Sequence, residues 1–191
     1  MASFSEIIKT VKPYFDDKEQ RQDQVLRLSR EIVRLSARAI KDIHTGEKDE
    51  LAHSLIELEA KVNEIKAVDD GFEHISAHCF QEYSEIKCLL AVFEQAELPD
   101  AKGLGIPAEA YLGGVADCVG EIRRSLQIAL KNGDFAKAEY FFARMNDIYD
   151  NLMLLKYSSS IIGPLKQKQD AARSAIDHAR SEMLMAKFAA R

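Results

Sequence analysis

The sequence predicts an all-α protein in which about seven helices form one bundle. Apolar residues recur at steps of three and four positions through almost every segment, which is typical of amphipathic helices. No stretch shows the sustained alternation of β-branched and polar residues that is typical of strands. The 191 residues include only 9 Gly and 4 Pro, so helix-breaking positions are few. We therefore expect a single all-α domain over residues 1–191, with helices too long for a repeat solenoid.

Local signals place the individual helices along the chain. Ser3 with Glu6 and Asp70 with Glu73 have the spacing of capping boxes at helix starts. Gly46 follows a helix end, and residues 132–134 (Asn-Gly-Asp) indicate a stop and a restart. The expected helices are 3–14, 17–45, 48–67, 70–96, 107–131, 134–157 with a break allowed, and 161–187, and the one real loop is 97–106.

Composition predicts a cytoplasmic protein without a membrane span. The N-terminus lacks the apolar core of a signal peptide, and no run of about 18 uncharged apolar residues occurs. Cys79, Cys88 and Cys118 form no Cys-x-x-Cys motif, and their apolar contexts predict small buried hydrophobes. The formal charge of −5 argues against nucleic-acid binding over the whole surface. Whether one part of the surface can bind nucleic acid therefore depends on where the positive charges lie.

Five cations follow one face of the helix expected at 17–45. They are Arg27, Arg30, Arg34, Arg38 and Lys41, which we call the cationic ridge. At 100° per residue the ridge lies roughly opposite the apolar stripe of the same helix. Such a ridge can track the phosphates of a nucleic acid, and the salt dependence of binding would report it. An exposed charged face, or a contact with the acids of a neighbouring subunit, explains the same spacing.

Two pairs of acids occur on two different predicted helices. Glu82 and Glu85 are three residues apart beside an apolar stripe, and Asp117 and Glu121 are four apart with Arg124 on their side. A buried carboxylate is costly unless it is paired, hydrogen-bonded or bound to a metal. Together the pairs would offer four oxygen ligands to Mg²⁺ or Mn²⁺, which suits metal-assisted hydrolysis of a phosphodiester. A helix edge facing solvent or a partner's Arg is the alternative for each pair.

Three glycines lie close to the second acid pair, at Gly113, Gly114 and Gly120. Glycine is a poor helix former, so its presence inside a predicted helix suggests that another backbone or a ligand approaches closely.

Several of these segments resemble the translin and Trax superfamily. The resemblance is carried by QEYSE at 81–85, YLGGVADCVGEIRR at 111–124 and NGDF at 132–135, and it continues into the long C-terminal helices. Trax-like members carry catalytic acids where this chain has Glu82, Glu85, Asp117 and Glu121, whereas translin-like members lack the acids of the QExxE motif. The resemblance therefore implies a Trax-like, catalytic-type subunit in a closed octameric shell.

The resulting functional prediction is a Mg²⁺-dependent or Mn²⁺-dependent endoribonuclease that acts on single-stranded RNA. The four acids are its predicted catalytic and metal-binding residues, and the cationic ridge with Arg124 is its predicted nucleic-acid-binding surface. A homo-octamer is the predicted assembly, and single-stranded DNA is a second predicted ligand. The alternative is a translin-like oligomer that binds single-stranded nucleic acid without cleaving it.

Two other motifs have part of the spacing of a metal site. Glu50 and His53 match one Glu-x-x-His step of a ferritin-like di-metal bundle, but the second such step is missing. His74, His78 and Glu82 form an i, i+4, i+8 ladder that has the spacing of zinc ligands, without an HExxH motif.

Apolar residues gather at both ends of the last expected helix. They are Ile161, Ile162 and Leu165 at its start, and Met183, Leu184, Met185 and Phe188 at its end. They predict a subunit interface, and burial in the subunit's own core is the alternative.

Overall fold

The computed structural model describes residues 3–189, and it contains helices and no strand in that part of the chain. Six helices are long and two consist of a single turn. The bounds are α1 Phe4–Thr45, α2 Lys48–Lys66, α3 Glu73–Phe93, α4 Ala101–Leu104, α5 Ala108–Lys131, α6 Phe135–Leu152, α7 Ser159–Ile162 and α8 Leu165–Ala189. The all-α prediction is confirmed. Residues 1–2 and 190–191 of the predicted domain lie outside the described part.

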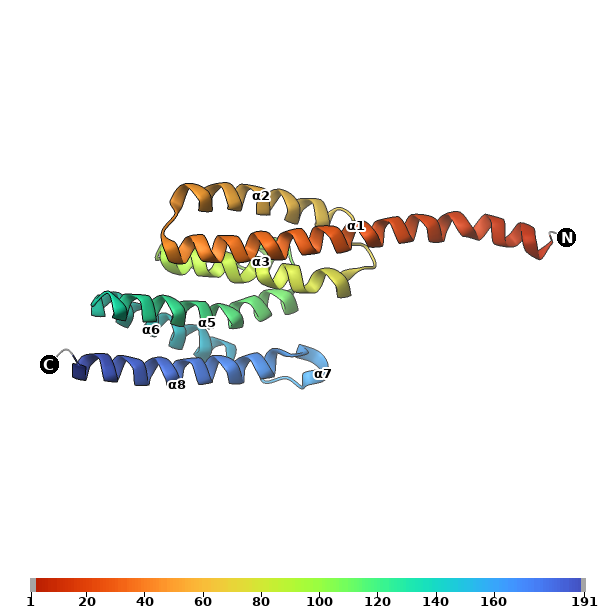
Figure 1. Ribbon diagram of the computed structural model, residues 1–191. Coiled ribbons are helices and arrows are strands. Elements are labelled where there is room, and N and C mark those ends of the chain that lie inside the picture. Colours follow the sequence, from red (N-terminus) through yellow and green to blue (C-terminus); the bar gives the residue numbers. More distant parts are fainter. Residues whose placement is uncertain (1–2, 190–191) are drawn as a thin grey trace.

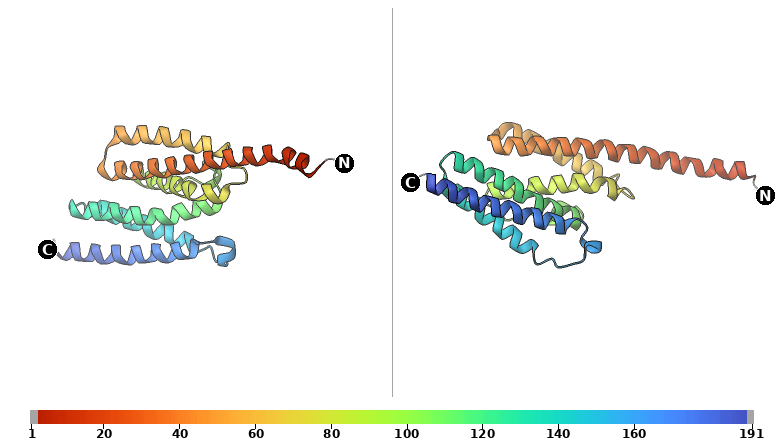
Figure 2. Two further views of the ribbon diagram at one scale, coloured as in Figure 1. Left: turned by 45° about the vertical axis from the view of Figure 1, so that its right-hand side comes forward. Right: turned by 60° about the horizontal axis from the view of Figure 1, so that its bottom comes forward.

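The long helices stack in layers, with α3 in the middle (Figure 1). The helices α1, α3, α5 and α8 run in one direction, and α2 and α6 run in the opposite direction (Figures 1 and 2). On one side Phe80, Tyr83 and Ile86 of α3 pack against α1 and α2. On the other side Leu89 and Val92 belong to a second apolar cluster with α5, α6 and α8. The two halves of the core therefore meet on α3, the helix that carries Glu82 and Glu85.

The first helix is longer than the sequence predicted. Its capping box of Ser3 and Glu6 is present as expected. The break expected between residues 14 and 17 is wrong, because α1 continues through Pro13 to Thr45. Proline removes one helical hydrogen bond, but at this exposed position water can satisfy the carbonyl that loses its partner. Residues 4–20 therefore form a helical extension that projects beyond the bundle (Figure 1).

Other ends differ from expectation for local reasons. The capping box expected from Asp70 is wrong, because α3 starts at Glu73 and the carboxylate of Glu73 accepts a hydrogen bond from the Gly71 N–H. The expected loop 97–106 contains the single turn α4, capped by Asp100. The stop and restart at residues 132–134 is confirmed. Within residues 3–189, none of the helices combines the length and the apolar character that crossing a bilayer requires.

Candidate functional site

Two glycines allow α5 to approach α3 closely. A Cβ added at Gly114 would lie 2.3 Å from the backbone oxygen of Gln81 and 2.6 Å from Cβ of Ser84. A Cβ at Gly113 would lie 2.6 Å from Oε1 of Gln81. The close approach expected at these two positions is confirmed. At Gly120 it is wrong, because no atom lies within 4 Å of an added Cβ.

The close crossing brings the two acid pairs into one group, which we call the acidic cluster: Glu82, Glu85, Asp117 and Glu121. Glu85 is only 7% exposed. Burial, together with the negative charges of the other three acids, raises the pKa of its carboxyl to about 8. Burial also raises the pKa of Glu82, and Asp117 and Glu121 add to this effect. The four carboxyl groups therefore lie close enough to share one electrostatic environment.

Asp117 receives a cation from the last helix. The ammonium of Lys168 on α8 donates to both carboxylate oxygens, at 2.8 and 2.6 Å. The side-chain amide of Gln81 donates to one of the same oxygens at 2.7 Å. A Lys and a Gln from two other helices thus hold the carboxylate of α5 in one orientation.

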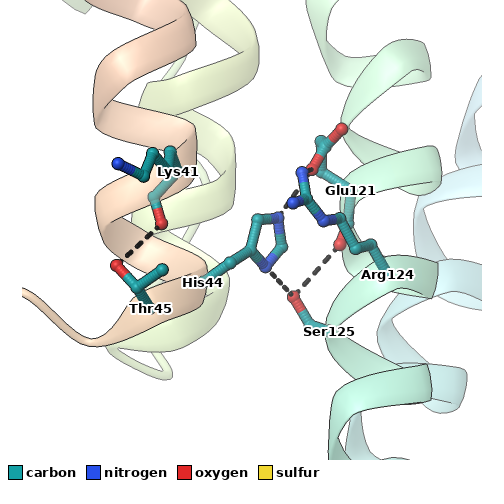
Figure 3. A network of polar contacts seen from close by, with 6 residues as sticks. All are labelled: Lys41, His44, Thr45, Glu121, Arg124 and Ser125. Atoms are coloured by element: carbon teal, nitrogen blue, oxygen red, sulfur yellow. Dashed lines mark hydrogen bonds and ion pairs between the residues drawn. The ribbon is translucent and has the colours of Figure 1, made fainter.

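Glu121 is held by His44 of α1 and by neighbours on its own helix (Figure 3). Its Oε2 lies 2.6 Å from Nε2 of His44, whose side chain is 2% exposed, and 3.6 Å from Nη1 of Arg124. Ser125 donates to the backbone oxygen of Glu121 at 3.0 Å and lies 3.4 Å from Nδ1 of His44. The hydrogen bond with His44, aided by Arg124, lowers the pKa of the Glu121 carboxyl. Glu121 is therefore ionised at neutral pH, in contrast to Glu85.

The chemistry of the acidic cluster fits a hard divalent cation. It offers carboxylate oxygens from two helices, and repulsion between them favours a bound positive charge. In the side-chain positions described for residues 3–189, no three His, Cys, Asp or Glu side chains come close enough together to hold a metal ion. This includes the ladder of His74, His78 and Glu82. In the acidic cluster Lys168 supplies the positive charge instead.

The cationic ridge lies along the exposed face of α1. All five of its residues are exposed, and Arg27 has a long ion pair with Glu31 at 3.9 Å. No hydrogen bond or ion pair joins the ridge to the acidic cluster in residues 3–189. Lys41 comes closest along the chain, one helical turn before His44 (Figure 3). Arg124 is the one predicted cation that the structure brings to an acid of the cluster.

Sequence reasoning missed His44 and Lys168 as members of the site. They lie 77 and 51 positions from the acids that they contact, and no spacing rule connects residues so far apart. Gln81 lay inside a recognised motif, but its contact with Asp117 depends on the packing of α3 against α5.

The three cysteines play no part in the site. All are free and buried, as the sequence predicted. Burial raises the pKa of Cys79 to about 11 and of Cys88 to about 12, so neither is a thiolate nucleophile at neutral pH.

Comparison with known proteins gives consistent relatives. The model of the Translin family matches residues 72–180, which include α3, α5 and α6 and most of the acidic site's surroundings. The uncharacterised protein MJ0175 of Methanocaldococcus jannaschii is 31% identical over 175 residues, covering 90% of this chain and 78% of that protein.

Solved structures agree with the family match. The structure of the AfC3PO complex with duplex RNA has a TM-score of 0.84 at 26% identity and covers 95% of this chain and 97% of that chain. The crystal structure of apo-NeC3PO has a TM-score of 0.88, with coverage of 97% and 98%, but only 18% identity, so it shows the fold alone.

Proposed function

Since the chain belongs to the Translin family, we propose that it is a Mg²⁺-dependent or Mn²⁺-dependent endoribonuclease that acts on single-stranded RNA as a homo-oligomer. The observation that carries this proposal is the acidic cluster of α3 and α5, in which burial, together with the charges of Glu82, Asp117 and Glu121, raises the pKa of Glu85 to about 8. Such an excess of negative charge is typical of a cation site.

RNA as the ligand has separate support. AfC3PO, a protein similar in sequence and fold, has a structure in complex with duplex RNA. The cationic ridge is exposed along α1 and offers this chain a surface for phosphates. The preference for single strands, a second role in binding single-stranded DNA, and assembly into an octamer follow the Trax-like resemblance. The buried free cysteines suit a reducing cytoplasm.

The four acids would hold the cation through their carboxylate oxygens. When bound, a hard divalent cation neutralises the charge that develops on phosphoryl oxygens and acidifies a water molecule. Glu121, already ionised, keeps its orientation through His44. Glu85 has to lose its proton before it can act as a ligand. The ammonium of Lys168 has to leave Asp117 before Asp117 can do the same. Arg124, half-exposed beside Glu121, would donate to a phosphate of the RNA.

A cleavage assay with purified protein and fluorescent single-stranded RNA tests this proposal. Mg²⁺ or Mn²⁺ should permit cleavage and EDTA should stop it. Replacement of a single acid by its amide, as in Glu85→Gln or Asp117→Asn, should abolish cleavage while RNA binding is retained. Glu109→Gln changes an exposed acid on the same helix α5 and should leave cleavage unchanged. Wild-type cleavage by a variant that lacks all four acids would contradict the proposal.

One observation favours the second candidate, a non-catalytic oligomer that binds single-stranded nucleic acid. Lys168 and His44 give Asp117 and Glu121 partners within the protein, and such pairs can serve a purely structural role. RNA binding that is unaffected by EDTA, without cleavage in any divalent cation, would select this candidate.

A further inference from the structure

A cavity of about 660 Å³ at one end of the bundle has no role in the function proposed above. It lies where α1, α3 and α5 end and where α2 and α6 begin, at the end opposite the N-terminus (Figures 1 and 2). Cavities of about 300–1,000 Å³ that combine apolar walls with a few polar groups are typical sites for small ligands. The chemistry of its walls therefore decides what this cavity can bind.

Two phenylalanines form part of the apolar wall of the cavity. The ring centroids of Phe93 and Phe141 are 5.3 Å apart, and Leu51 and Leu90 continue the wall. The ammonium of Lys137 lies 5.9 Å from the centroid of the Phe93 ring and 5.8 Å from that of Phe141. Unpaired nucleobases stack on aromatic side chains, and cations add to such stacking. The wall therefore suits a flat, unpaired base.

A buried carboxyl group supplies the cavity with a hydrogen-bond acceptor. Asp42 lines the cavity and is only 5% exposed. Ser54 donates to its Oδ2 at 3.3 Å, whereas no residue from 3 to 189 donates to its Oδ1. Two exposed acids, Glu94 and Asp134, line the cavity as well, and Asp134 also caps α6. Acceptors of this kind match the N–H groups on the Watson–Crick edge of a base better than they match a phosphate.

Two residues of the cavity wall also contact the acidic cluster. His44 and Ser125 line the cavity. Nε2 of His44 lies 2.6 Å from Oε2 of Glu121, and Ser125 donates to the backbone oxygen of Glu121 (Figure 3). A base in the cavity would therefore be separated by a single residue from an acid of the cluster.

The cationic ridge leads along α1 to the same cavity. Its last member, Lys41, lies one helical turn before Thr45, which lines the cavity and donates to the Lys41 backbone oxygen at 3.1 Å (Figure 3). Lys48 and Lys137 at the cavity are exposed and form no ion pair with any residue from 3 to 189. They would extend the row of cations for the phosphates of a strand that follows the ridge.

We propose that this cavity binds one unpaired nucleobase of the RNA strand whose phosphates lie along the ridge and beside the acidic cluster. The base stacks on the aromatic wall beside Phe93 and donates an N–H group to Asp42. In a duplex the bases stay stacked and their Watson–Crick edges stay paired, so only an unpaired base can enter. The cavity would thus be a source of the preference for single strands. This inference rests on the proposed binding of RNA and is independent of cleavage.

The absence of tryptophan from the sequence makes a direct test possible. The variant Phe93→Trp places a single indole in the wall of the cavity, and a base that stacks on it should quench its fluorescence. In EDTA, a short single-stranded RNA should quench this emission. A strand of equal length made of abasic ribose phosphates should bind without quenching. Ile56→Trp, at an exposed position on α2 that does not line the cavity, is the control and should keep its emission.

Two further ligands identify the source of the base. A duplex of the same sequence should quench the indole of Phe93→Trp much less than the single strand does. Free AMP and GMP, at the same concentration, should have little effect, because they lack the phosphates that the ridge binds. Quenching by the duplex or by a mononucleotide that equals the effect of the single strand would overturn the proposal.

The ratio of the affinities for the normal and the abasic strand provides a second readout. Phe93→Ala should lower this ratio by about 5-fold to 100-fold, the range expected for loss of base stacking. Lys137→Ala changes an exposed residue that is not part of the core, so it keeps the proposal testable if Phe93→Ala does not fold, and it should lower the ratio as well. Ile56→Ala should keep the wild-type ratio.

The outcomes separate this inference from the proposed function. Fluorescence anisotropy of labelled RNA, measured on the same samples, reports whether the strand is bound. Binding without quenching, or an unchanged affinity ratio in folded Phe93→Ala and Lys137→Ala, would overturn the base site while leaving the proposed RNA binding intact. No binding to any RNA would overturn both. Because all measurements are made in EDTA, the result does not depend on whether the protein cleaves RNA.

Discussion

Glu85 and Glu121 are carboxyl groups of one cluster whose surroundings move their pKa values in opposite directions. Burial among like charges raises the pKa of Glu85 to about 8, whereas the hydrogen bond with His44 lowers the pKa of Glu121. At neutral pH one group is mostly protonated and the other ionised. Because one of the two groups is protonated, the metal-free protein avoids the repulsion that four simultaneous negative charges would create.

The raised pKa of Glu85 predicts that the metal-free protein loses stability as the pH rises. Between the ordinary pKa of 4.5 and the folded value of about 8, the folded state binds more protons than the unfolded state. The contribution of Glu85 is therefore complete below pH 4.5 and disappears as the pH passes 8. Denaturant unfolding in EDTA should show this decline, on the order of several kcal/mol at most.

The variant Glu85→Gln isolates this effect, because the amide keeps the shape of the side chain and does not titrate. Its free energy of unfolding should decline less between pH 5 and 9 than that of the wild type. Glu109→Gln, at an exposed position on α5, should retain the wild-type slope. Equal slopes for all three proteins would show that Glu85 is not protonated in the folded state.

His44 predicts a difference between two substitutions at one position. Its Nε2 lies 2.6 Å from Glu121, and partners of metal-binding groups typically affect metal affinity 10-fold to 100-fold. His44→Ala should therefore weaken Mn²⁺ binding by about that factor, measured directly by electron paramagnetic resonance. His44→Gln keeps a side-chain donor and should recover part of the affinity.

His53→Ala is the matched control, because His53 is exposed on α2. It should bind Mn²⁺ like the wild type. If His44→Gln lost as much affinity as His44→Ala while both remained folded, the hydrogen bond to Glu121 would not be what orients the carboxylate.

At the scale of elements, the crossing of α3 and α5 decides whether the acidic cluster forms. Gly114 sits where an added Cβ would lie 2.3 Å from the Gln81 backbone oxygen, so the two helices would have to move apart. Gly114→Ala should destabilise the protein by about 1–3 kcal/mol, the usual range for overpacking, and should reduce metal binding as well.

Gly120 on the same helix provides the control for Gly114. Space is open around it, so Gly120→Ala should only gain helix propensity and stabilise the protein by about 0.5–1 kcal/mol. Urea denaturation measures both variants. Equal effects would mean that the close approach of α3 and α5 does not require glycine.

Sequence patterns predicted those features that depend on neighbours along one helix. The apolar stripe of α1, the capping box of Ser3 and the acid pairs all follow from spacing within a few turns. The continuity of α1 was missed because proline ordinarily predicts the end of a helix. Here Pro13 is exposed, so water can satisfy the carbonyl that loses its helical hydrogen bond. His44 and Lys168 were missed because tertiary packing brings them to the acids from other helices.

The apolar residues that predicted an interface at the two ends of the last helix are partly buried and partly exposed. Leu165 and Met183 are buried in the subunit's own core, which was the alternative expectation. Ile161, Leu184 and Met185 are 65%, 54% and 71% exposed and remain available to a partner. The larger exposed apolar surface lies on the extension of α1, because that helix continues past the end of its own bundle.

At the scale of the whole molecule, a chain with a formal charge of −5 has to bind RNA through a local surface. The cationic ridge spans about 21 Å at 1.5 Å per residue, so one copy can contact only a few phosphates. Several copies in the proposed oligomer would offer several ridges to one strand, and linked weak sites bind a long ligand far more tightly than separate ones.

The ridge therefore predicts how RNA binding responds to salt. Replacement of all five ridge residues by Ala should weaken binding to every sequence and lower the slope of log K against log salt, by roughly 0.7 for each phosphate of a single strand that the ridge neutralises. Fluorescence anisotropy at a series of salt concentrations measures this slope. Ile56→Glu, which alters an exposed apolar residue on α2, keeps the ridge and should match the wild type. An unchanged salt slope in the five-site variant would place the RNA on another surface.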